Sequence, residues 1–203
     1  MSPIRMLAVL LLLMVLCPAL LSGCGKSAPS RFYILDPVML DAGQLPRAGG
    51  ERCTTIGVGP VRIPAYLDRQ QMVTRLGPNR LDLADFDKWA EPLEENLSRV
   101  CAQNLENELC TKKVAVFPWP SSRDVDFQVV MDILRLDGSL GQQASLHVRW
   151  QVLDGQGRLL QAERSHYSTS MQAETYEALA QALSSLIQAH SRDIGRAIAS
   201  FMD

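Results

Sequence analysis

In Ser145-Leu-His-Val-Arg-Trp-Gln-Val-Leu153, every second side chain from Leu146 to Val152 is apolar and those between are polar. This period of two predicts a β-strand that buries one face and leaves the other in water. Asp154-Gly-Gln-Gly157 follows directly and is typical of a hairpin turn. Arg158–Ser168 is therefore expected to return as an antiparallel strand.

Six further runs, rich in β-branched or aromatic residues and bounded by Gly and Pro, also predict strands. They are Phe32–Leu35, Thr54–Ile63, Gln71–Arg75, Arg80–Phe86, Val114–Phe117 and Phe127–Leu136. We expect Pro64–Asp68 to form a turn and Gly77-Pro-Asn79 to join two antiparallel strands tightly. All four residues of Val114–Phe117 are apolar, which predicts a buried strand.

Two segments carry apolar residues at spacings of three and four, the period of an amphipathic helix. The first opens at Trp89-Ala-Glu-Pro-Leu93, where Pro92 suits a first helical turn, and ends near Leu109. The second runs from Glu174 to Phe201. We interpret its apolar stripe as packing against the sheet, with a partner-binding helix as the alternative. The predicted fold is α+β, a mostly antiparallel sheet with two main helices packed on one face, in a single domain at residues 31–203.

The N-terminal segment has the pattern of an export signal. Arg5 precedes the unbroken apolar run Met6–Leu16, and small residues follow. Leu21-Ser-Gly-Cys24 resembles the bacterial lipobox, in which the cysteine carries lipid and the bond before it is cleaved. Residues 1–23 are therefore expected to be a lipoprotein signal peptide, cleaved between Gly23 and Cys24.

The alternative for this segment is a retained transmembrane helix. Its apolar run is interrupted by Pro18 and is shorter than the roughly 20 residues that span a bilayer. We therefore expect residues 24–30 to form a lipidated tether with the anchor on Cys24. Gly25 stands where an Asp would favour inner-membrane retention in enterobacterial lipoproteins. It predicts sorting to the periplasmic face of the outer membrane, with the inner membrane less favoured.

Charge and motifs argue against several function classes. The net charge is −2, and removing residues 1–23 takes away one arginine and no acid, which leaves −3. A mildly acidic chain does not indicate nucleic-acid binding. Gly57-Val-Gly59 is only a fragment of a dinucleotide-binding fingerprint, and no phosphate-binding loop or Gly-x-Ser-x-Gly elbow occurs. His147, His166 and His190 are scattered in the sequence, so we expect no catalytic residue, no metal site and no cofactor.

Three cysteines follow the tether, and the oxidising periplasm permits a disulfide between two of them. Cys101 lies at helical spacing with neighbouring leucines, which indicates a buried free thiol. Cys110 lies at the end of the same predicted helix, and Cys53 lies just before a predicted strand. Cys53–Cys110 is therefore the favoured pair if a disulfide forms.

The order of these motifs resembles the ABC-type transport auxiliary lipoprotein family, the PqiC-like lipoproteins of intermembrane transport systems. The marks are the lipobox, Phe32-Tyr-Ile-Leu35, Val61-Arg-Ile-Pro-Ala-Tyr-Leu67, Trp89-Ala-Glu-Pro-Leu93, the glycine-containing hairpin and the long terminal helix. The resemblance implies a non-enzymatic accessory subunit of a transporter for lipids or other hydrophobic solutes. It also implies a periplasm-spanning MCE-domain protein as partner, an ABC permease and ATPase in other subunits, and self-assembly as a further option.

Aromatic and apolar residues on loops are the candidates for partner contact. Tyr66 and Leu67 follow Pro64 in a turn, and Trp89 precedes a helix. The alternative is that these side chains fasten the loops to the core. A second functional hypothesis is a periplasmic lipid-binding carrier with its own apolar pocket.

Overall fold

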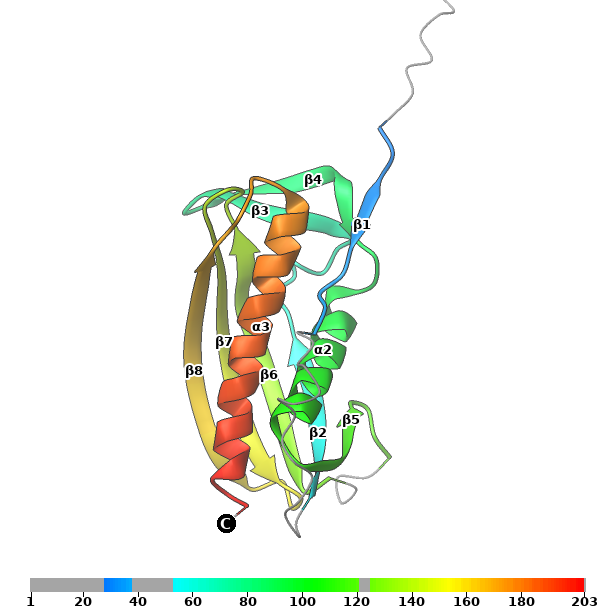
Figure 1. Ribbon diagram of the computed structural model, residues 1–203, viewed down its shortest axis with the longest axis vertical. Helices are drawn as coiled ribbons and strands as arrows, with labels where there is room; N and C mark the ends of the chain where they lie inside the picture. Colours follow the sequence, from blue (N-terminus) through cyan, green and yellow to red (C-terminus); the bar gives the residue numbers. More distant parts are fainter. Residues whose placement is uncertain (1–27, 38–52, 121–124, 203) are drawn as a thin grey trace, which may run out of the picture.

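The structure is a computed structural model that describes residues 28–37, 53–120 and 125–202. Within these residues it confirms an α+β fold, with two helices and eight strands (Figure 1). The elements in chain order are β1 (Arg31–Tyr33), β2 (Thr54–Arg62), β3 (Gln71–Gly77), β4 (Arg80–Trp89), α2 (Leu93–Glu108), β5 (Thr111–Val116), β6 (Phe127–Gly138), β7 (Gln143–Asp154), β8 (Leu159–Ser170) and α3 (Tyr176–Ala199).

The strands form two mixed sheets, whereas the sequence predicted one mostly antiparallel sheet. The larger sheet has the order β5-β2-β6-β7-β8 and the smaller has the order β1-β4-β3. β6–β7, β7–β8 and β3–β4 are antiparallel, whereas β2 runs parallel to both β5 and β6 and β1 runs parallel to β4. Parallel neighbours need a long connection, and the β3–β4 hairpin with α2 supplies it between β2 and β5.

Both helices cover one face of the larger sheet, as expected (Figure 1). α2 contacts β2 and β5, α3 contacts β6, β7 and β8, and the two helices contact each other. The core between them contains completely buried large side chains, among them Leu97, Leu146 and Ile194. Each such aliphatic side chain contributes about 1.5–3 kcal/mol when it leaves water.

Local hydrogen bonds set where the elements begin. The Thr175 side chain accepts a 3.1 Å hydrogen bond from the Ala178 amide and caps the N-terminus of α3. The buried Asn96 side chain accepts from the Leu35 amide at 2.7 Å and donates to the Leu35 carbonyl at 3.1 Å. This pair of bonds fixes the segment after β1 against α2.

The smaller sheet lies at one end of the larger one, beside the point where the N-terminal segment enters (Figure 1). β3 contacts β6, and the Ser139 hydroxyl donates to the Arg75 carbonyl at 2.7 Å. Ser139 directly follows β6, so this contact places the small sheet at the Gly138 end of the large sheet. The hairpin between β7 and β8 lies at the other end.

Candidate functional site

An apolar surface lies where β5 ends, and we call it the β5-end surface. It consists of Pro60, Val61, Val116, Phe117 and Pro118, and α2 borders it with Glu94, Glu95 and Ser98. The side chain of Phe117 is 50% exposed, and Val116 and Pro118 are also exposed. Exposed aromatic and aliphatic side chains that lie together are typical of protein-protein contact sites.

Two glycines of β2 hold the aromatic residues of this region in place. A Cβ atom at Gly59 would lie 2.5 Å from the Cβ of Phe117, and one at Gly57 would lie 2.7 Å from the Trp119 ring. Gly59 also has a φ angle of 125°, which favours glycine. Phe117 and Trp119 pack edge to face with ring centroids 5.4 Å apart. Gly57 and Gly59 lie within β2, so they do not form a nucleotide-binding turn. The absence of a side chain at these two positions leaves room for Trp119 and Phe117.

The expectation that Val114–Phe117 is a buried strand was wrong at its C-terminal end. β5 is an edge strand of the larger sheet, and Phe117 lies just beyond it in solvent. Sequence reasoning therefore missed the exposed aromatic residue. The signal was the sequence Phe117-Pro-Trp-Pro120, because prolines this close together exclude the interior of a sheet.

The three residues expected to contact a partner lie elsewhere. Leu67 is buried, and Trp89 is only 5% exposed and belongs to the hydrophobic core. These two side chains fasten their segments to the core, which is the alternative given for them: Leu67 buries the turn after Pro64, and Trp89 buries the end of β4 before α2. Tyr66 is half-buried and packs against the same core, with its hydroxyl 3.4 Å from Asp137.

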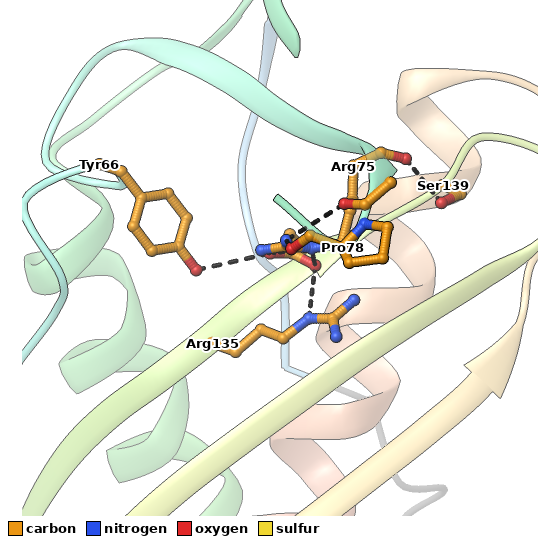
Figure 2. Close-up of polar contacts among 7 residues, drawn as sticks. Tyr66, Arg75, Pro78, Arg135 and Ser139 are labelled. Carbon is orange, nitrogen blue, oxygen red and sulfur yellow. Dashed lines mark hydrogen bonds and ion pairs between the residues drawn. The ribbon is translucent and has the colours of Figure 1, made fainter. Parts of the chain in front are cut away.

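Tyr66 belongs to a buried ionic cluster around Asp137 (Figure 2). The Asp137 side chain is 0% exposed. Arg75 Nη2 donates to Asp137 Oδ2 at 2.7 Å, and Arg135 Nε donates to Oδ1 at 2.7 Å. Arg75 also donates to the Pro78 carbonyl at 2.9 Å. The cluster therefore ties β3 and its turn to β6, and so the small sheet to the large one.

The electrostatics of this cluster point to a structural role. Burial by itself would raise the pKa of Asp137, but the hydrogen bonds from Arg75 and Arg135 outweigh it and lower that pKa. A carboxylate held ionised by two guanidinium groups is a poor proton acceptor near neutral pH. Asp137 is therefore unsuited to general base catalysis.

The histidines, scattered in sequence, are partly brought together by the fold. His147 and His166 face each other across β7 and β8, with ring centroids 4.0 Å apart. Burial and the neighbouring imidazole both lower the pKa of His147. His190 is completely buried beside Trp150 and Tyr167. Among the described residues, no three His, Cys, Asp or Glu side chains are grouped to hold a metal ion.

The cysteines of the folded part take different roles. Cys53 and Cys110 form a disulfide with a Cα–Cα distance of 4.8 Å, the pair that the sequence favours. Cys101 is buried, accepts a 3.6 Å hydrogen bond from Ser191, and has its pKa raised by burial to about 11. Such a thiol is unreactive near neutral pH.

The expected lipidation, cleavage and sorting residues Cys24, Gly23 and Gly25 lie outside the described residues. Within residues 28–37, 53–120 and 125–202, neither helix combines the length and the apolar character needed to span a bilayer.

Comparison with known proteins identifies a matching family and a related protein. The family described as ABC-type transport auxiliary lipoprotein component matches residues 33–195. The Escherichia coli K12 protein named intermembrane transport lipoprotein PqiC is 25% identical over 140 residues, which cover 69% of this chain and 72% of PqiC.

Two solved structures share the fold. The crystal structure of an uncharacterized protein superposes with a TM-score of 0.69 at 19% identity, covering 84% of this chain and 99% of that one. Protein XCC0632 from Xanthomonas campestris gives a TM-score of 0.66 at 15% identity, covering 82% of this chain and 93% of that one.

Proposed function

Since the chain belongs to the ABC-type transport auxiliary lipoprotein family, we propose that it is a lipid-anchored docking subunit of an intermembrane transport system. Its partner is the periplasm-spanning MCE-domain protein of that system, and its cargo class is lipids or other hydrophobic solutes. By holding this partner at a membrane, the subunit supports membrane integrity. It acts through binding and performs no catalysis, so ATP hydrolysis belongs to another subunit.

The observation that carries the docking role is the β5-end surface. Phe117 stands half in solvent, with its Cβ packed against Gly59 and its ring edge to face with the ring of Trp119. An exposed aromatic side chain that its neighbours hold in one place loses little conformational freedom on binding, which favours its use as an anchor for a partner. The neighbouring carboxylates of Glu94 and Glu95 supply a polar rim.

The anchor in this proposal is the lipid on Cys24, after cleavage at Gly23. Two or more acyl chains hold a protein stably on a bilayer, whereas a single chain holds it only marginally. Gly25 after the cysteine supports the periplasmic face of the outer membrane as the location. The folded domain then needs no spanning element of its own.

Co-purification of the MCE-domain protein tests the docking role. The full-length lipoprotein, extracted in mild detergent, is expected to retain the partner, and Phe117→Ser is expected to retain much less. Leu159→Ser is the matched control, because Leu159 is 57% exposed and lies at the hairpin end of β8. Equal retention by both variants would contradict a role for the β5-end surface. No retention by the unchanged protein would contradict docking altogether.

The lipid-carrier alternative requires an apolar pocket. One hollow, on the outer face of the larger sheet, is bordered by the charged side chains Arg62, Asp132 and Arg149. Charged walls disfavour an acyl chain. Native mass spectrometry of the full-length protein distinguishes the two functions, because a carrier would retain a lipid in addition to its covalent anchor.

A further inference from the structure

We propose that a second apolar surface, beside the tether, rests directly on the lipid bilayer. We call it the tether-end face, and it consists of Phe32, Ile34 and Phe86. All three side chains are exposed, and Phe32 is 62% exposed, the largest fraction among the exposed large hydrophobic side chains of the described residues. The inference rests on the proposed lipid anchor at Cys24 and adds a contact to it.

The alternation of side chains makes this face apolar. Tyr33 and Leu35 point into the protein, where Leu35 is completely buried and Tyr33 packs against the core. Phe32 precedes Tyr33 and Ile34 lies between Tyr33 and Leu35, so both alternate with the inward side chains and point to solvent. This reverses the usual arrangement, in which the outward positions of a strand are polar.

Phe86 belongs to the same face by strand register. Phe32 pairs with Lys88 in the parallel β1–β4 ladder. Phe86 precedes Lys88 by two residues, so it lies on the same side of β4 as Lys88, displaced toward the tether.

Polar contacts hold β1 in this orientation. Arg31 donates two hydrogen bonds of 2.8 Å to the two carboxylate oxygens of Asp87. The Tyr33 hydroxyl donates to Asp87 Oδ1 at 2.8 Å, and Asn96 binds the Leu35 backbone. Because both ends of the segment are fixed, Phe32 and Ile34 cannot turn inward by a small rotation of the strand.

The length of the tether selects the bilayer as the occupant of this face. Arg31, the first residue of β1, follows Cys24 by seven residues. Seven extended residues reach about 25 Å at most, so a lipid on Cys24 keeps the tether-end face within that distance of the membrane surface. Aromatic side chains are enriched in the boundary between headgroups and acyl chains, and an apolar contact beside a lipid anchor strengthens binding.

The charges around the face indicate an apolar contact. Asp82 and Asp85 are exposed on the same strand as Phe86, which also carries the exposed Arg80 and the half-buried Lys88, and Arg31 is paired with Asp87. These charges of both signs nearly cancel and give little net attraction to anionic headgroups. Contact is therefore expected with zwitterionic phosphatidylcholine and is expected to change little with salt.

Quenching of tryptophan by lipid bromine atoms tests the inference. The full-length lipoprotein and its Phe32→Trp and Leu159→Trp variants are reconstituted in vesicles of phosphatidylcholine, either plain or brominated in the acyl chains. The quenching of the unchanged protein is subtracted, because it has three tryptophans. Leu159 is a matched control, since it is similarly exposed and lies roughly 35 Å along β8 from the end that meets the small sheet.

The inference expects a roughly twofold loss of the added emission for Phe32→Trp, since the side chain would lie about 5–10 Å into the boundary region. Leu159→Trp keeps its emission. If the protein floats with the vesicles and neither variant is quenched, the membrane contact is wrong while the anchor stands. A blue-shifted but unquenched Phe32→Trp variant would mean that protein covers the face, which also overturns the inference. If mass spectrometry finds no lipid on Cys24, the premise itself fails.

Discussion

Replacing Asp137 with Asn would remove the one negative charge that binds two arginines beneath the small sheet. Asn keeps the shape of the side chain, so the change isolates the charge. Arg75 and Arg135 would then face each other without a counter-ion, and their side chains are only 18% and 33% exposed. Both guanidinium groups would recover water only in part.

The structure allows an estimate of the cost. Removing one partner of a fully buried ion pair costs about 3–5 kcal/mol, because a charge remains buried without compensation. The two arginines are partly exposed, so the expected loss in the free energy of unfolding is about 2–3 kcal/mol. For a chain of this size, that loss lowers the midpoint of thermal unfolding by about 4–12 °C.

Thermal and urea unfolding of the full-length protein in mild detergent, followed by tryptophan fluorescence, measures this loss. Asp132→Asn is the matched control, because Asp132 lies on the same strand between two arginines, at 3.2 Å from Arg62 and 3.9 Å from Arg149. It is 32% exposed, so we expect a loss of about 1 kcal/mol or less. An equal loss in both variants would refute the reasoning that burial makes the Asp137 cluster stabilising.

Three further predictions concern other parts of the fold. Burial lowers the pKa of His190 from 6.5 to about 4, so below pH 6.5 the unfolded chain takes up a proton that the folded chain does not. The free energy of unfolding should therefore fall by about 2 kcal/mol between pH 7 and pH 5, and His190→Gln should lose most of this dependence in urea titrations. Replacing Cys53 and Cys110 with Ser removes a cross-link between residues that are 57 positions apart, so the free energy of unfolding should fall by about 4 kcal/mol. If reducing conditions leave the stability of the unchanged protein as it was, the disulfide is contradicted. Gly59→Ala should lower the free energy of unfolding by about 1–3 kcal/mol and weaken retention of the partner. Gly77→Ala is the control and should change neither, because a Cβ atom at Gly77 meets nothing within 4 Å.

Local periodicity explains why most elements could be predicted from the sequence. The β7–β8 hairpin and both helices follow directly from periods of two and of 3.6. The parallel pairing of β2 with β5 and β6 could not be predicted this way, because it depends on the path of the connections and not on any local pattern.

The candidate site was harder to predict because exposure depends on tertiary neighbours. The sequence pattern of an apolar strand is the same in the interior of a sheet and at its edge, so Phe117 was expected to be buried. The opposite error affected Trp89, which lies before a helix but packs into the core. The cluster of Arg75 and Asp137 joins residues 62 apart, and no short motif marks it.

The proposed docking role and the proposed membrane contact both require the lipid at Cys24. Mass spectrometry of the N-terminal peptide, from protein extracted from membranes, tests this directly. We predict a peptide that begins at Cys24 and carries the mass of a diacylglyceryl group and its acyl chains. A peptide in which Gly23 is still joined to Cys24, or in which the thiol is unmodified, would contradict it.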